Sequence, residues 1–86
     1  MKIRKELIKR EIAGETILIP VGKTVYETNG MFALNELGTF IWDRLEQTEN
    51  QEELVRAVME EYEVDEETVR QDVEEFLGKL SALGVI

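Results

Sequence analysis

Carboxylates are the most abundant groups in this chain that could do chemistry. The 86 residues include 19 Asp and Glu but no His and no Cys. Without those two residue types the chain has no imidazole base, no thiolate nucleophile and no Cys/His metal site. The acidic runs at Glu60-Glu61, Asp65-Glu66-Glu67 and Glu74-Glu75 fall at helix starts or on polar helix faces. We therefore interpret them as solvated surface rather than as catalytic pairs.

Motifs that bind metals, phosphates or cofactors are also missing from the sequence. Glu60, Glu61, Glu63 and Asp65 could gather around a hard cation, but the D-x-D-x-D-G spacing of a calcium loop is absent. The chain contains no G-x-x-x-x-G-K-[ST], G-x-G-x-x-G, G-x-S-x-G or H-E-x-x-H. Its one serine, Ser81, lies in an apolar helical stretch. We predict a protein with no catalytic residues, no metal and no cofactor.

The charge is divided unevenly along the chain. Residues 1–33 carry six Lys and Arg against four Asp and Glu, whereas residues 34–86 carry four against fifteen, so the net charges are +2 and −11. An acidic half of this kind repels nucleic-acid phosphates and anionic lipid headgroups, and we predict neither partner. It serves as a solvated surface, or it attracts a basic peptide or a basic patch on a protein.

The sequence also indicates the compartment and the number of domains. No apolar run approaches the roughly 20 residues that span a bilayer. The amino end, MKIRKELIKREIAGE, is interrupted by charges too often for a signal peptide. The absence of cysteine fits a reducing compartment, so we expect a cytoplasmic protein. At this length residues 1–86 form a single domain.

The stretch from Leu34 to Leu45 positions the strands before it and the helices after it, because it joins a β half to a helical half. Its helical stripe of apolar residues consists of Leu37, Phe40, Ile41 and Leu45. Asn35 stands just before that stripe, where its side chain can accept a backbone N–H of the first turn. We expect Trp42, the only Trp, to lie in the core.

The β half consists of short extended segments separated by turn signals. We predict strands at 6–12 and 16–21, joined at Ala13-Gly14-Glu15, with Pro20 at a strand end or facing an edge. Residues 24–28 form either a third short strand or a loop. Asn29-Gly30 is typical of a tight hairpin turn, and Met31 to Leu34 follows as an apolar extended segment.

The helical half contains two further helices. Asn50 and Glu53 resemble a capping box before a helix to about Tyr62, and Asp65 is an N-cap candidate before a helix to about Leu83. Leu54, Val55, Val58, Met59 and Tyr62 form the first stripe, and Val69, Val73, Phe76, Leu77, Leu80 and Leu83 form the second. Gly84 is a suitable terminator. The fold class is α+β: a small winged helix-turn-helix-like domain, with about three N-terminal antiparallel strands followed by three helices.

The last two helices raise the possibility of DNA binding through a helix-turn-helix pair. A recognition helix offers basic and amide side chains to bases and phosphates. The last helix here carries six Asp and Glu against Arg70 and Lys79. Its charge opposes that role, and a short apolar strand beside a helix instead favours capture of an extended peptide by strand addition.

Five motifs follow one another along the chain: Asn29-Gly30-Met31, Leu34-Asn35-Glu36-Leu37-Gly38 with Phe40-Ile41-Trp42, Val64-Asp65-Glu66-Glu67-Thr68, Asp72-Val73-Glu74-Glu75-Phe76-Leu77 and Leu83-Gly84-Val85-Ile86. In this order and spacing they resemble the PqqD-like family, named after a small accessory protein of pyrroloquinoline quinone biosynthesis. The resemblance extends from about Ile8 to Ile86 and implies a small winged helix-turn-helix fold. It also implies a RiPP recognition element, a non-catalytic adaptor for ribosomally made peptides that are modified after translation.

The resemblance implies both the partners and the binding site. Such an adaptor captures the leader segment of a precursor peptide and presents the peptide to a modifying enzyme, often a radical SAM protein. The leader adds as a strand to the third strand and rests on the last helix. The implied peptide-binding residues are Met31, Phe32, Ala33 and Leu34 on the strand, and Val69, Asp72, Val73 and Phe76 on the helix. A winged-helix transcription regulator and a structural interaction subunit are the alternatives.

Overall fold

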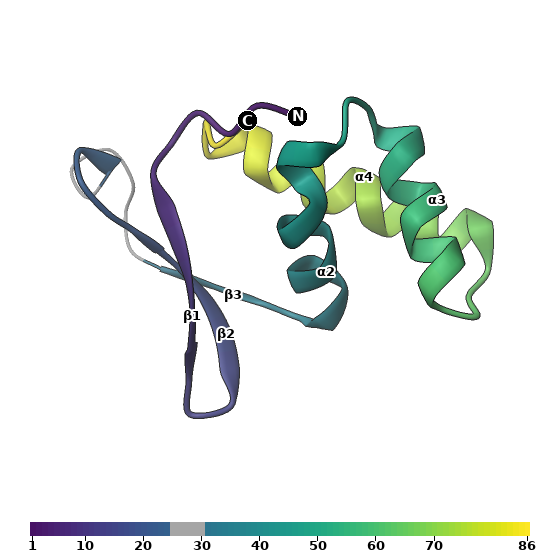
Figure 1. Cartoon of the computed structure of the whole chain (residues 1–86), viewed down its shortest axis with the longest axis horizontal. Helices are drawn as coiled ribbons and strands as arrows, with labels where there is room; N and C mark the ends of the chain where they lie inside the picture. The colour runs from purple at the N-terminus through teal and green to yellow at the C-terminus, as the bar shows by residue number, and fades with distance from the viewer. Residues whose placement is uncertain (25–30) are drawn as a thin grey trace.

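The computed structural model describes residues 1–24 and 31–86 (Figure 1). An antiparallel sheet in the order β1-β2-β3 precedes the helices of this part of the chain. This arrangement confirms the predicted α+β class and the predicted order of elements. The possible strand at 24–28 and the turn at Asn29-Gly30 lie outside the described residues, apart from Thr24. That threonine is buried, and its hydroxyl accepts a hydrogen bond from the Glu6 backbone N–H at 2.8 Å.

The strands are close to their predicted positions. Their bounds are Leu7–Ile12 for β1, Glu15–Pro20 for β2 and Phe32–Leu34 for β3. Every residue of β1 pairs with one of β2, from Leu7 with Pro20 to Ile12 with Glu15. The prediction that Met31 belongs to the last strand was wrong, because β3 begins at the next residue and the Met31 side chain is 60% exposed.

A two-residue turn joins β1 to β2. Ala13 has φ of 52° and Gly14 has φ of 81°, so both residues are in the left-handed region. Tight hairpins favour this combination because its twist matches the twist of the strands. Glycine adopts it freely, whereas the Cβ of Ala13 is strained there.

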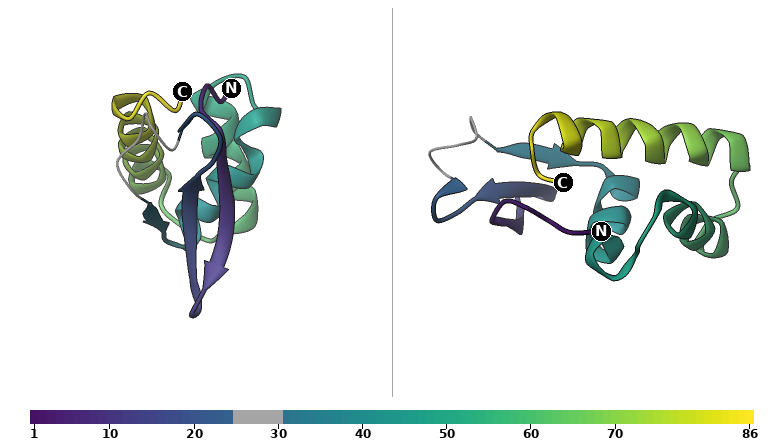
Figure 2. Two further views of the ribbon diagram at one scale, coloured as in Figure 1. Left: turned by 90° about the vertical axis from the view of Figure 1, so that its left-hand side faces the viewer. Right: turned by 90° about the horizontal axis from the view of Figure 1, so that it is seen from above.

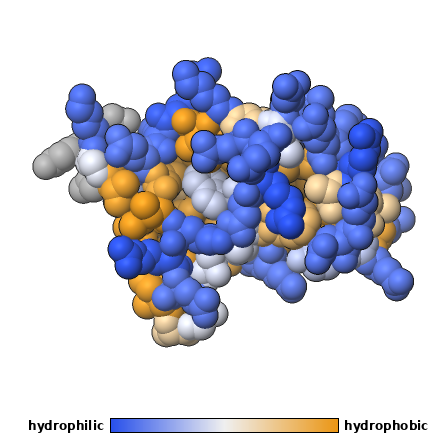
Figure 3. Space-filling view, viewed as in Figure 1, coloured by the Kyte–Doolittle hydropathy of each residue, from blue (hydrophilic) through white to orange (hydrophobic). Residues whose placement is uncertain are grey.

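One face of the sheet packs toward the helices. Leu18 on β2 is fully buried, and Leu34 on β3 is 8% exposed. Successive side chains of a strand alternate between faces, so Ile8, Ile17 and Ile19 lie on the opposite face, where they are half-buried. In the space-filling view, hydrophobic residues gather over the strands and hydrophilic residues cover most of the helical part (Figure 3).

The helical half begins directly after β3. Its elements are α2 at Glu36–Arg44, a 3-10 turn η1 at Leu45–Gln47, α3 at Gln51–Glu61 and α4 at Glu66–Ala82. Each α-helix starts at the predicted cap. The side chains of Asn35, Asn50 and Asp65 accept backbone N–H groups three residues later, at 2.7, 3.0 and 3.1 Å. These bonds satisfy donors that a helix start otherwise leaves unpaired.

The last helix, α4, ends just before the glycine that the sequence predicted as its terminator. Gly84 has φ of 74°, and the Val85 N–H reaches back to the Leu80 carbonyl at 2.8 Å. This six-to-one bond is the Schellman arrangement, which lets the chain leave the helix with its last carbonyls satisfied. Val85 is thereby fully buried. The prediction of Leu83 as a core residue was wrong, since it caps the helix and is 41% exposed.

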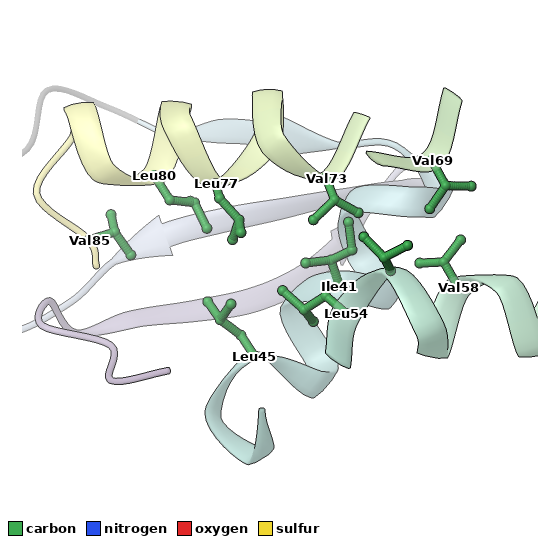
Figure 4. Close-up of a cluster of buried hydrophobic side chains, with 10 residues drawn as sticks. Ile41, Leu45, Leu54, Val58, Val69, Val73, Leu77, Leu80 and Val85 are labelled. Atoms are coloured by element: carbon green, nitrogen blue, oxygen red, sulfur yellow. The ribbon is translucent and has the colours of Figure 1, made fainter. Parts of the chain in front are cut away.

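The core lies between α2, α3 and α4 (Figure 4). Ile41 of α2 and Leu54 of α3 point toward Val73 of α4 in that view. All three side chains are essentially inaccessible. Trp42 is only half-buried and packs against the edge of this core, so its predicted place in the core is confirmed in part.

The hairpin of β1 and β2 projects away from the helices, whereas α4 crosses behind α2 (Figures 1 and 2). Lys9 on β1 and Asp43 on α2 form an ion pair of 2.5 Å between the two parts. Within the described residues, no helix has the length and apolar character needed to cross a membrane.

Candidate functional site

Among residues 1–24 and 31–86, the sheet has a free edge at β3. Within the described residues β3 pairs only with β2, antiparallel, with Phe32 opposite Leu18 and Leu34 opposite Thr16. An unpaired strand edge presents N–H and C=O groups that can hydrogen-bond to another extended chain. The direction of each backbone group on β3 decides which residues could do this.

One hydrogen bond beside the paired ends of β1 and β2 shows which residue pairs of the sheet are hydrogen-bonded. The Val21 N–H donates to the Glu6 carbonyl at 3.0 Å. Hydrogen-bonded pairs alternate with non-hydrogen-bonded pairs along an antiparallel ladder. Ile17 of β2 therefore directs its backbone groups toward β1, whereas Thr16 and Leu18 direct theirs toward β3. Pro20 is the last residue of β2, as predicted, and it falls in a non-hydrogen-bonded pair with β1, so its missing N–H removes no bond to that strand.

The same alternation determines the direction in which the backbone N–H and C=O groups of β3 point. Because Phe32 and Leu34 are opposite Leu18 and Thr16, their backbone groups point toward β2. Ala33, opposite Ile17, turns its N–H and C=O to the free edge. Sequence alone could not tell whether Ala33 or its neighbours Phe32 and Leu34 face outward, because that choice depends on the register with β2.

An open groove of about 1140 Å³ runs along this edge. Phe32, Ala33 and Leu34 form its strand side, and Phe76 and Lys79 belong to the opposing helix α4. In the view from above, β3 runs alongside the carboxyl-terminal half of α4 (Figure 2). The groove thus combines backbone hydrogen-bonding groups with an apolar helix face, which are the two requirements for binding an extended peptide.

The predicted helix residues differ in their access to the groove. Phe76 is half-buried and lines it. Asp72 is exposed and lines two smaller hollows that adjoin the groove at Asn35. Val73 is fully buried in the core, so its side chain supports the wall from behind and offers no surface to a peptide. Val69 is 2% exposed and forms only the floor of one of the hollows.

A glycine of α2 lies where this helix approaches α4 closely. A Cβ added to Gly38 would lie 3.3 Å from the Phe76 ring and 3.2 Å from the Asn35 side-chain oxygen. Both distances are shorter than ordinary van der Waals contact. Gly38 therefore lets the Phe76 ring approach α2 while Asn35 caps that helix.

An aromatic cluster at the other end of the groove was missed by the sequence analysis. The rings of Phe40 and Tyr62 meet edge to face with centroids 5.4 Å apart. The Arg44 guanidinium lies over the Phe40 ring at 3.5 Å, an arrangement favoured by the ring quadrupole. Burial and the nearby Glu36 carboxylate raise the pKa of Tyr62 above its ordinary value. The spacing of Phe40 and Arg44, four residues apart on one helix, was the available signal.

The carboxylates of the described residues are dispersed or paired on the surface. Among the described residues no group of three acidic side chains is arranged to hold a metal ion. The two carboxylates with the clearest partners, Glu52 and Asp43, form surface ion pairs with Arg70 and Lys9. The arrangement is suited to binding an extended chain.

The fold and site together define a small α+β domain in which a free strand edge faces a helix. Comparison with family models identifies a match to PqqD, coenzyme PQQ synthesis protein D, over residues 15–86. The chain belongs to the PqqD family, as the sequence motifs predicted. A solved structure titled "TbiB1 in Complex with the TbiA(beta) Leader Peptide" is similar to it, with a TM-score of 0.74 and 33% identity. That match covers 99% of this chain and 93% of TbiB1. No curated protein matches the sequence significantly.

Proposed function

We propose that this protein is a non-catalytic adaptor that captures the leader segment of a ribosomally made precursor peptide. The observation that carries the proposal is the outward-facing backbone of Ala33 beside an open groove. Membership of the PqqD family and the similarity to TbiB1, whose structure holds a leader peptide, support it.

The proposed binding mode is strand addition at β3. The leader's backbone pairs with Ala33, and its side chains on one face enter the groove against Phe76. Phe32 and Leu34 complete the strand side, whereas Met31 precedes the strand and does not line the groove. In this proposal Asp72 adds charge, while Val69 and Val73 hold the helix wall in place from the core.

The charge of the helical half suggests the kind of leader that fits. Residues 34–86 carry fifteen Asp and Glu against four Lys and Arg. A leader with Lys or Arg would gain from that field, and the gain would decrease as salt screens it. The same field opposes binding to nucleic acid, so nothing in the described residues favours the transcription-regulator alternative.

In this proposal the adaptor acts with a modifying enzyme in the cytoplasm. The adaptor holds the leader, and the enzyme acts on the remainder of the same precursor. A radical SAM protein is the enzyme class that we expect, from the resemblance to PqqD-like adaptors. Genes next to the one for this protein should encode that enzyme and a short precursor.

Calorimetry tests the central proposal. The domain is titrated with the synthetic leader of the short precursor encoded beside it, at low and at high salt. We expect a one-to-one complex that weakens with salt but survives at high salt, because backbone hydrogen bonds and apolar contacts remain. Absence of heat and of any chemical-shift change with every nearby candidate leader would contradict the proposal.

A further inference from the structure

A second, smaller hollow lies just past the end of β3. It measures about 290 Å³ and opens where the amino-terminal end of α2 meets the carboxyl-terminal end of α3 and the first turns of α4. Its lining comprises Asn35, Glu36, Leu37, Val58, Tyr62, Val64, Thr68, Val69 and Asp72. The proposed strand addition uses only the charge of Asp72 from this hollow and assigns no occupant to its interior.

The lining of the hollow separates into an apolar interior and an acidic rim. Leu37, Val58 and Val69 supply aliphatic side chains from three different helices. Glu36 and Asp72 are the only charged residues of its lining, so the lining carries a net negative charge. Neither carboxylate forms an ion pair with a cation of residues 1–24 or 31–86.

The two helix starts at the rim do not offset the negative charge of the lining. The amino-terminal ends of α2 and α4 border the hollow, and a helix start by itself favours an anion. Both starts are already capped, because Asn35 and Asp65 each accept one of the exposed backbone N–H groups. Acidic residues also occupy the first turns of both helices. The remaining field at the mouth favours a cation.

The hollow is continuous with the peptide groove. Asn35 lines both, as do Glu36 and Tyr62. Asn35 directly follows the last residue of β3. A peptide that pairs with β3 and continues past its end can therefore reach the mouth of the hollow.

We propose that this hollow is a subsite for one lysine or arginine side chain of the bound peptide. The inference rests on the proposed peptide-binding function and adds a specificity-determining position to it. The aliphatic stem of the side chain lies between Leu37 and Val69, and its cationic head reaches Asp72 at the rim. Long basic side chains commonly bury their methylenes in this way and keep the charge at the surface.

A random-peptide display library tests the subsite without knowledge of the natural precursor. Twelve-residue peptides are selected on the immobilised protein and on Asp72→Asn, with Glu74→Gln as the matched control. Glu74 is also exposed on α4, but it lines neither the groove nor the hollow. We expect Lys or Arg to be enriched at one position in peptides selected on the parent and on Glu74→Gln, and this enrichment to be lost on Asp72→Asn.

One selected peptide then gives the size of the effect. Replacing its enriched basic residue by norleucine should weaken binding to the parent about three- to tenfold, as expected for a charge pair at a partly exposed rim. The same replacement should have little effect on binding to Asp72→Asn. In Asp72→Lys the selected position should change to Asp or Glu.

The outcomes separate the two proposals. If peptides are captured, depend on the β3 edge and show no basic position that responds to Asp72, the subsite is wrong and strand addition stands. If no peptide is captured, or if captured peptides bind Ala33→Pro as well as the parent, the proposed strand addition itself is wrong. Asp72 is exposed, so neither substitution there should prevent folding.

Discussion

Proline at Ala33 is the sharpest test of peptide capture at the sheet edge. The register turns the Ala33 N–H away from β2, so proline removes a donor that the folded domain does not use. We expect the free energy of unfolding to change by less than about 1 kcal/mol, because no ladder bond is lost. Phe32 has the opposite orientation, so Phe32→Pro breaks the ladder to Leu18 and removes a half-buried ring. That variant should lose about 3 kcal/mol or more.

The expected effect of Ala33→Pro on binding follows from one hydrogen bond. A net backbone hydrogen bond contributes about 0.5–1.5 kcal/mol, and the peptide carbonyl left without its donor adds to the loss. Together these amount to about 1–2 kcal/mol, which corresponds to about a five- to thirtyfold increase in Kd. Ala33→Gly is the control, since it removes the methyl group but keeps the N–H.

The assay combines calorimetry with the leader peptide and urea unfolding of the same three proteins. The expected pattern is weak binding by a stable Ala33→Pro, near-normal binding by Ala33→Gly and a destabilised Phe32→Pro. If Ala33→Pro remains folded and binds as tightly as the parent, the peptide does not pair with this edge. The derived backbone orientation would also be refuted if Phe32→Pro were as stable as Ala33→Pro.

Four further predictions concern the fold. Asn35→Ala removes the acceptor of the Gly38 N–H, and it should lower the free energy of unfolding by about 1 kcal/mol in urea denaturation; no change would show that water replaces the cap equally well. Ala13→Gly relieves the positive φ in the hairpin turn, so it should raise the melting temperature, with a gain of about 0.5–1 kcal/mol; a lower melting temperature would count against strain at that residue. Trp42→Ala should lose about 2 kcal/mol, less than the 3–5 kcal/mol typical of a fully buried aromatic residue, because Trp42 is half-buried; an unchanged melting temperature would mark it as a surface contact. The hydrogen bond from Arg70 lowers the pKa of Glu52 in the folded state. This pair therefore stabilises the protein above the ordinary carboxyl pKa, and the stabilisation is lost as the pH falls through the lowered pKa. Arg70→Gln should make the free energy of unfolding depend less on pH in the acid range, and an unchanged pH dependence would refute the coupling.

Local chemistry in the sequence determined much of the architecture. Asn35, Asn50 and Asp65 each cap the helix predicted to follow, because a short side chain can satisfy backbone donors only three residues away. Gly84 ends the last helix for a similarly local reason, since only glycine enters the left-handed region without strain. Apolar periodicity located the helices, and short apolar segments between turn signals located the strands. The family motifs also lie within these local segments, which is why they could be identified without the fold.

Features that depend on distant segments required the tertiary structure. The outward orientation of Ala33 follows from its register with β2, and register joins residues that are far apart in the chain. Val73 fits the helical stripe as well as Phe76 does, but packing against α2 and α3 buries Val73 and leaves Phe76 at the groove. The cluster of Phe40, Arg44 and Tyr62 forms only when α3 ends beside α2. Sequence therefore specified which segments could bind a peptide, and long-range packing determined which of their atoms face it.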